Sequence, residues 1–357
     1  MRCWRPEQLQ ELIDRLLADD YRVLGPRVDE LAMVYDEIDS LPVGWGDTQE
    51  AGHYRLRKRQ DQSRFGYNLG PHTWKQFLFP PRENIFRVRD GNFISARTEP
   101  QKMAFIGVRA CELSAIAIQD KVFTGPVPEP GYKQRRDSLL VVAVNCSQAA
   151  ASCFCDSTGD GPEVNTDADL ILTEFDPDDP WYLVQAGSPR GECLLKDIPG
   201  TAATDDADRH LADLMENTRQ QMHRKLDKTG LPETLLTALD HSNWSDVADR
   251  CLACGNCTQV CPTCFCSSAR DDQDLNSGDV TRVRYWESCF NEGHSYVAGG
   301  IVHGSVRSRY RQWLTHKLAS WELQYGSSGC TGCGRCISWC PVGIDLTEEV
   351  SRFRSPS

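Results

Sequence analysis

Two cysteine runs of the same spacing, C-x2-C-x2-C-x3-C-P, offer the clearest chemistry in this chain. The first run contains Cys251, Cys254, Cys257 and Cys261, and the second contains Cys330, Cys333, Cys336 and Cys340. This is the ligand pattern of bacterial 4Fe-4S proteins, in which three cysteines hold one cluster and the fourth binds the cluster of the other run. Two runs therefore predict two 4Fe-4S clusters and a role in electron transfer.

The crossover of the fourth cysteine predicts which residues share a cluster. We expect one set to be Cys251, Cys254, Cys257 and Cys340, and the other to be Cys330, Cys333, Cys336 and Cys261. Gly255 and Gly334 place a residue without a side chain where each loop must bend around its cluster. A pair of zinc sites is the alternative, but zinc ribbons use CxxC pairs rather than four-cysteine runs that end in CP.

Four more cysteines follow two apolar segments in the first half of the chain. Residues 103–108 and 139–144 predict buried strands, and residues 112–123 predict a helix after the first of them. The cysteines at or after the carboxyl ends of these strands are Cys111, Cys146, Cys153 and Cys155. Open α/β sheets bind ligands at that edge, and a helix N-terminus favours a thiolate. The group could hold a third 4Fe-4S cluster; alternatively, its members are small buried core residues.

The long segment between the two runs contains three further cysteines, Cys264, Cys266 and Cys289. They lack a clear fourth ligand, so we expect them to pack around the two clusters. Apolar residues from Val306 to Trp321 recur at helical spacing, which predicts a helical insertion. A basic stripe in the same segment comprises Arg307, Arg309, Arg311 and Lys317. We expect solvent to cover this stripe, with a partner surface or an acidic cofactor as the alternative.

Composition limits the class of protein. The 357 residues are 40% hydrophobic and 25% charged, which suits two or three folded domains. We expect neither secretion nor a membrane span, because no signal-like segment and no apolar stretch of membrane-spanning length is visible. Seventeen cysteines suit a reducing compartment, which favours the cytoplasm. The formal net charge of −12 argues against a nucleic-acid partner.

The order of elements predicts a multidomain α+β protein, with an N-terminal α/β domain followed by a helical dicluster ferredoxin-like domain. We divide it into an α/β subregion at 1–100, an α/β domain with the candidate third site at 101–200, a helical linker at 201–249 and the dicluster domain with its helical insertion at 250–357. Residues 6–39 predict helix, strand and helix. Residues 101–200 lack a GxGxxG or P-loop fingerprint, so we expect flavin and nicotinamide to bind another chain.

Several strings of the sequence carry a family resemblance. They are residues 105–113, 145–146, 152–155, 261–266, 288–290, 307–317 and 330–336. Together they resemble the beta subunit of cytosolic NAD(P)-linked NiFe sulfhydrogenases over nearly the whole chain, and the cluster segment is also similar to the electron-entry subunit of anaerobic sulfite reductase. Two mild departures occur beside Cys111, where Ala110 replaces an expected proline and Glu112 an expected aspartate.

The resemblance implies a function without a substrate site on this chain. Sulfhydrogenase beta subunits relay single electrons through 4Fe-4S clusters between the large and small NiFe hydrogenase subunits and an FAD-containing, NAD(P)H-binding gamma subunit. An electron-transfer subunit of a sulfite reductase and a metal-stapled scaffold are the alternatives. No acid-base pair or nucleophile triad can be assembled from the eight histidines, so we predict no catalytic residue.

Overall fold

The two apolar segments at residues 103–109 and 140–144 form the centre of a mixed sheet. The structure is a computed structural model that describes residues 1–95 and 101–354. Strands β8 (Met103–Arg109) and β9 (Leu140–Val144) are buried along their whole length, as expected for parallel strands covered on both faces. They pair in parallel with each other and with β2 (Arg22–Asp29) and β10 (Leu170–Phe175). Their carboxyl ends lead directly toward Cys111 and Cys146.

Four further strands extend this sheet with antiparallel pairs. They are β1 (Arg2–Trp4), β3 (Ala32–Glu37), β11 (Trp181–Ala186) and β12 (Thr201–Ala202). The complete order is β12-β1-β11-β10-β9-β8-β2-β3. The predicted helix in the second part of residues 6–39 is wrong, because β3 pairs there with β2 in a hairpin. Strands from the expected subregions 1–100 and 101–200 thus share one sheet, and residue 100 itself lies outside the described residues.

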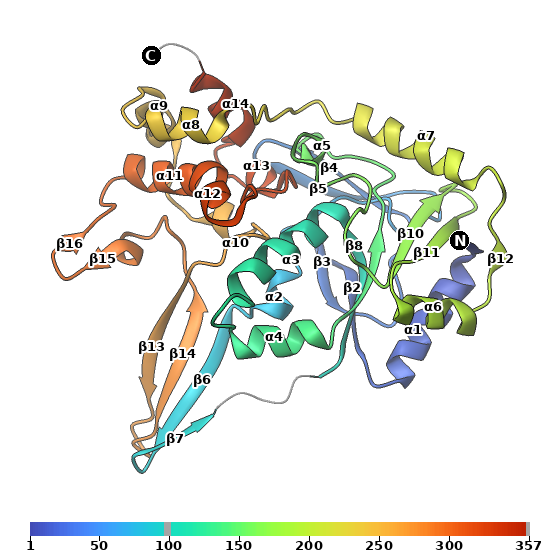
Figure 1. Ribbon diagram of the computed structural model, residues 1–357, viewed down its shortest axis with the longest axis horizontal. Helices are drawn as coiled ribbons and strands as arrows, with labels where there is room; N and C mark the ends of the chain where they lie inside the picture. Colours follow the sequence, from blue (N-terminus) through green and yellow to red (C-terminus); the bar gives the residue numbers. More distant parts are fainter. Residues whose placement is uncertain (96–100, 355–357) are drawn as a thin grey trace.

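Helices cover both faces of the sheet (Figure 1). Helix α1 (Pro6–Ala18) buries Leu9, Leu12, Ile13 and Leu16 at helical spacing, and this stripe packs with α6 (Pro189–Asp197) on one face. Helices α3 (Ala110–Phe123) and α4 (Pro130–Asp137), with the short α2 (Lys75–Leu78), pack on the other face. The third-site cysteines are therefore held at the edge of a well-packed α/β sandwich.

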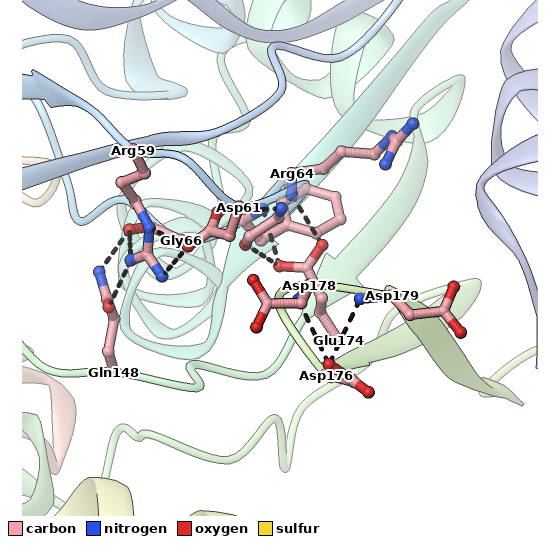
Figure 2. Close-up of polar contacts among 11 residues, drawn as sticks. Arg59, Asp61, Arg64, Gly66, Gln148, Glu174, Asp176, Asp178 and Asp179 are labelled. Carbon is pink, nitrogen blue, oxygen red and sulfur yellow. Dashed lines mark hydrogen bonds and ion pairs between the residues drawn. The ribbon is translucent and has the colours of Figure 1, made fainter.

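A loop after the hairpin of β4 (Trp45–Glu50) and β5 (His53–Lys58) is fastened to the sheet by Glu174 of β10 (Figure 2). The Glu174 carboxylate accepts hydrogen bonds from Ser63 Oγ at 2.5 Å, Arg64 N at 2.7 Å and Phe65 N at 3.0 Å. Arg59 pairs with Asp61 in the same loop. This fixed loop continues to residues 70–72, where two carbonyl oxygens contact the second cysteine run.

A β-arm extends away from the sandwich and from the helical region (Figure 1). Its strands follow the order β13-β14-β6-β7, with β6 at Arg82–Arg89, β7 at Asn92–Ser95, β13 at Ser267–Gln273 and β14 at Val280–Trp286. The predicted all-helical insertion is therefore wrong for residues 267–286. These residues form a hairpin because β14 pairs with β6, a partner far away in the sequence.

The remaining elements are mainly short helices around a separate apolar core. After α7 (Ala207–Gln220), they are α8 (Leu231–Thr237), α9 (Asn243–Arg250), α10 (Asn256–Gln259), η1 (Glu292–Ser295), α11 (Val306–Thr315), η2 (His316–Ser320), α12 (Trp321–Tyr325), α13 (Arg335–Ser338) and α14 (Leu346–Arg352). A short hairpin of β15 (Tyr296–Val297) and β16 (Gly300–Ile301) precedes α11, and the turn α5 (Cys155–Thr158) lies beside the sandwich. Within residues 1–95 and 101–354, no helix has the length and apolar character needed to cross a bilayer.

Candidate iron-sulfur centres

The structure brings the fourth cysteine of the second run to the first run. Cys251, Cys254, Cys257 and Cys340 line one hollow of about 470 Å³, which we name the first site. Helix α10 begins inside the first run and helix α13 begins inside the second. The two short helices contact each other, so the two runs lie side by side. Backbone N–H groups point at the ligand sulfurs, from Ala253 N to Cys251 Sγ at 3.4 Å and from Ile344 N to Cys340 Sγ at 3.3 Å.

The walls of the first site fit a 4Fe-4S cluster. Phe290, Tyr310 and Trp313 line the hollow together with aliphatic residues, which gives it a largely apolar wall. The Tyr310 hydroxyl and the Trp313 indole N–H are buried and have no hydrogen-bond partner among the described residues. Such donors normally find a partner when they are buried, and cluster sulfur would provide one. Burial raises the pKa of Cys257 well above its usual value, so its thiolate needs a bound cation.

The second site contains Cys330, Cys333 and Cys336, and Cys261 lies close enough to each of them to affect their pKa. Burial raises the pKa of both Cys330 and Cys333 to about 12. Lys317, only 6% exposed, donates from Nζ to Cys261 Sγ at 3.3 Å. A hydrogen bond from Cys264, followed by the Lys317 ammonium, lowers the pKa of Cys261 well below its usual range although burial opposes this shift. The predicted solvent-covered stripe is therefore wrong for Lys317, and also for Arg309, which is buried in α11.

A buried ion pair joins the second site to the sandwich. Arg335 lies between Cys333 and Cys336, and its guanidinium pairs with the Glu112 carboxylate at 2.6 Å, with both side chains 1% exposed. Arg335 also donates to the carbonyl oxygens of Gly70 and His72, each at 2.9 Å. Glu112 accepts further hydrogen bonds from the Tyr35 hydroxyl and the Trp74 indole. We name this group of contacts the seam; sequence patterns gave no sign of it beyond the unusual Glu112.

The third candidate group packs against the second cysteine run. Cys111 and Cys155 are buried in one cluster with Leu69 and Met222, and Cys153 and Cys333 pack against it. Cys146 is near enough to influence the pKa of Cys153. A hydrogen bond to Cys155, together with burial, raises the pKa of Cys111 well above its usual value. All four predicted cysteines are thus neighbours, and the second run contributes Cys333 to the same place.

The three cysteines expected to pack around the clusters occupy a cavity of their own. Cys264, Cys266 and Cys289 line it together with His316 and Lys317. In the part of the chain that the structure describes, no group of three or more His, Cys, Asp or Glu side chains is arranged to hold a single metal ion. A 4Fe-4S cluster uses a different geometry, because each of its ligands binds a different iron atom.

Comparison with known proteins identifies the family. A model of the 4Fe-4S dicluster domain matches residues 250–344. Sulfhydrogenase 2 subunit beta of Pyrococcus furiosus is 31% identical over 284 residues, which cover 78% of this chain and 82% of the relative. The chain belongs to the sulfhydrogenase beta subunit family. As a sulfhydrogenase beta-type chain, it is an iron-sulfur electron-transfer subunit of a sulfhydrogenase-like oxidoreductase.

A more distant similarity concerns half of this sulfhydrogenase beta-type chain. F420-dependent formate dehydrogenase subunit beta of Methanocaldococcus jannaschii is 20% identical over 192 residues, which cover 52% of this chain and 42% of the relative. No solved structure matches the chain. The family and the dicluster domain therefore rest on sequence similarity, and the spatial relation of the cysteines comes from the present structure.

Proposed function

We propose that this chain relays single electrons between a pair of NiFe hydrogenase subunits and a FAD-containing subunit that binds NAD(H) or NADP(H). The observation that carries the proposal is the first site, where Cys340 from the second run faces the same hollow as Cys251, Cys254 and Cys257. This arrangement is the one that two adjacent 4Fe-4S clusters require. The clusters would supply one-electron redox chemistry, and the chain would supply no substrate site.

The protein's own residues would hold and tune the clusters. Cysteine thiolates of the first and second sites would bind iron, and the backbone N–H groups of Ala253 and Ile344 would stabilise the negative charge on sulfur. The aromatic walls would keep water away and lower the local dielectric constant. Lys317 would favour the reduced, more negative state of the second site, because its ammonium lies against Cys261.

Contacts between the sites support a continuous electron path. Cys336 of the second run also lines the first hollow, and Cys333 of the same run packs beside the third candidate group. At the other end, Cys254 is exposed and its neighbour Leu252 is 64% exposed. We propose that electrons cross the protein surface near Cys254 and pass inward through the second site toward the sandwich.

We further propose a third 4Fe-4S cluster at Cys111, Cys146, Cys153 and Cys155. Its support is the mutual proximity of these cysteines at the carboxyl edge of the sheet. Helix α3 begins there at Ala110, so Cys111 lies in its first turn. The cytoplasm, with its reducing thiol pool, would suit a protein with this many thiolates. The domain division at residues 100, 200 and 249 remains our proposal for how these parts are organised.

The relay is tested in the assembled complex with Cys333→Ser. We expect this variant to lose hydrogen-dependent reduction of NAD(P) while it keeps hydrogen oxidation with an artificial dye that accepts electrons directly at the hydrogenase pair. Cys193→Ser is the matched control, because Cys193 is exposed on α6 and far from the cysteine sites in sequence. It should keep both activities.

Three outcomes would contradict the relay. If Cys333→Ser keeps hydrogen-dependent NAD(P) reduction, electrons bypass the second site. If the native complex contains siroheme and no nickel, the partner is a sulfite reductase rather than a hydrogenase. A chain that contains only redox-inactive metal would instead be a structural scaffold.

A further inference from the structure

The cavity of Cys264, Cys266 and Cys289 is separate from the three sites already described. These cysteines come from two segments, one directly after the first run and one directly after β14. The cavity and the first hollow are similar in size, about 340 and 470 Å³ when the space that opens to solvent is included. Cysteines that serve only as small apolar core residues are expected to be closely packed, whereas these three thiols line an open space.

The sulfur atoms around the cavity interact in two separate pairs. Cys266 and Cys289 hydrogen-bond to each other, whereas Cys264 hydrogen-bonds to Cys261 of the second site. His294 also hydrogen-bonds to Cys266. The thiols are therefore spread around the cavity instead of meeting at one point. This distribution fits a four-iron cluster, because each iron takes its own ligand.

Two buried lysine side chains lie at this cavity and at the second site beside it. Lys75 is 5% exposed, and its Nζ donates to the carbonyl oxygens of Cys261 at 3.0 Å and Cys264 at 3.1 Å. Lys317 lines the cavity and contacts Cys261. The two ammonium groups donate to carbonyl, hydroxyl and thiol groups of the second site and the cavity, including Thr263 Oγ1 and Gly329 O. Buried charges require an opposite charge, and thiolate-bound iron-sulfur groups carry one.

A candidate for a fourth ligand lies in an irregular helical turn beside the cavity. Residues 316–320 form the π-helical turn η2 between α11 and α12, a rare conformation that is frequent at functional sites. This turn places His316 in the cavity wall. Trp321, which is 2% exposed and lines the same wall, has an indole N–H without a partner among the described residues. The cavity thus offers an imidazole ligand and an unused hydrogen-bond donor.

We propose that Cys264, Cys266, Cys289 and His316 hold an additional 4Fe-4S cluster next to the second site. Three thiolates and one imidazole complete the four ligands, His294 donates a hydrogen bond to Cys266, and Lys75 and Lys317 balance the negative charge. The site goes beyond the proposed relay, since it concerns the metal content of this chain whichever subunits it meets. Its position beside Cys261 would connect it to the second site.

Metal analysis of the anaerobically purified full-length chain tests this site. We expect Cys289→Ser to lose about four iron and four sulfide per chain relative to Cys193→Ser, while the signals of the first and second sites persist in the EPR spectrum. Cys111→Ser should remove a different group of about four iron, so the loss in a double variant should be additive. With all four clusters present, the wild-type chain would contain about sixteen iron.

Either of two results in the Cys289→Ser variant would overturn the additional cluster. One is an unchanged iron and sulfide content in Cys289→Ser; the other is a single zinc that disappears with this substitution. If Cys289→Ser does not fold, pulsed EPR of the reduced wild-type chain decides, because a directly bound imidazole nitrogen must be visible and must vanish in His316→Ala. Absence of this nitrogen coupling would also overturn the proposal. Neither measurement depends on hydrogenase activity, so failure here leaves the relay unaffected.

Discussion

The two cysteine runs have the same spacing but opposite surroundings. In the first run, Cys254 and Asn256 are exposed, and the hollow opens beside the exposed Leu252. In the second run, the position of Asn256 is taken by Arg335, which is buried in the seam with Glu112. The cysteines would therefore determine where iron binds, and the residues between them determine whether a loop faces solvent or another part of the protein.

The glycines of the two runs show the same difference. Gly332 has a φ of +64°, and a Cβ there would lie 2.6 Å from Cys155 Cα. The equivalent position in the first run is Ala253, which has a φ of +51°. Both loops need a left-handed residue, but only the second also needs the space that glycine provides. Close packing against the sandwich explains why the first run tolerates a methyl group where the second does not.

The largest effect is expected from a substitution that tests to which cluster the fourth cysteine of a run contributes its thiolate. Cys340→Ser should disrupt the first site, because Cys340 lines its hollow, and should leave the ligands of the second site in place. About four iron should be lost, and the segment from residue 251 to 344 should become more sensitive to protease, since metal binding and folding are coupled. Mössbauer and EPR spectra of Cys340→Ser and Cys254→Ser would be compared. Matching spectra support the crossover, whereas a match with Cys333→Ser would show that the ligands are paired differently.

The seam gives the next largest effect. Arg335→Met leaves the Glu112 carboxylate buried without its cation, and breaking such a pair costs about 3–5 kcal/mol. Asn256→Met changes the equivalent exposed position and should alter the free energy of unfolding by less than about 0.5 kcal/mol. Anaerobic urea denaturation of the cluster-loaded chains measures both.

A double variant separates the effect of the lost ion pair on stability from the effect of lost packing at the seam. Adding Glu112→Gln to Arg335→Met removes the unpaired charge, so part of the stability should return. The Tyr35 hydroxyl and the Trp74 indole would still have a side-chain oxygen to bond. Equal destabilisation by Arg335→Met and Asn256→Met would mean that the buried ion pair of the second run does not contribute more to stability than the exposed position of the first run.

Sequence patterns predict the local features of this protein better than the long-range ones. The buried strands at 103–109 and 140–144 and the helix after the first can be predicted, because each is encoded by a short apolar pattern. The hairpin of β13 and β14 cannot, since its polar strands are stabilised by pairing with β6 across the chain. The second helix predicted within residues 6–39 is wrong for the same reason, because residues 32–37 form β3, which depends on its partner β2.

The candidate sites show the same limit. The spacing within each run indicates its ligands, and the structure brings Cys340 to the first run. Lys317 and His316 gave no such signal, because a basic stripe on a helix usually faces water and the π-helical turn that moves these residues inward has no clear sequence pattern. The seam could not be predicted either, since Arg335 and Glu112 are far apart in the sequence and meet only in the folded chain.

Lys317 offers the smallest and most selective test of the difference between the runs. Burial opposes its charge, but the thiolates, Cys261 first among them, raise the pKa of Lys317 well above its usual value, so it stays positive. Its ammonium lies 3.3 Å from Cys261 Sγ, whereas Cys340 Sγ accepts a backbone N–H from Ile344. Removing the positive charge makes addition of an electron to the second site less favourable. Lys317→Met should therefore lower the reduction potential there by an amount on the order of 100 mV.

The first site should change far less in Lys317→Met, because its fourth cysteine, Cys340, accepts a backbone N–H and no lysine of the described residues donates to its sulfur. Lys121→Met is the control: Lys121 is an exposed lysine that donates to Tyr325 O and Ser327 Oγ rather than to sulfur. EPR-monitored redox titration resolves the clusters by their signals. A common shift of all clusters would indicate a general change in the fold. A shift confined to the second site would show that two runs with the same ligands are set to different potentials by the residues around them.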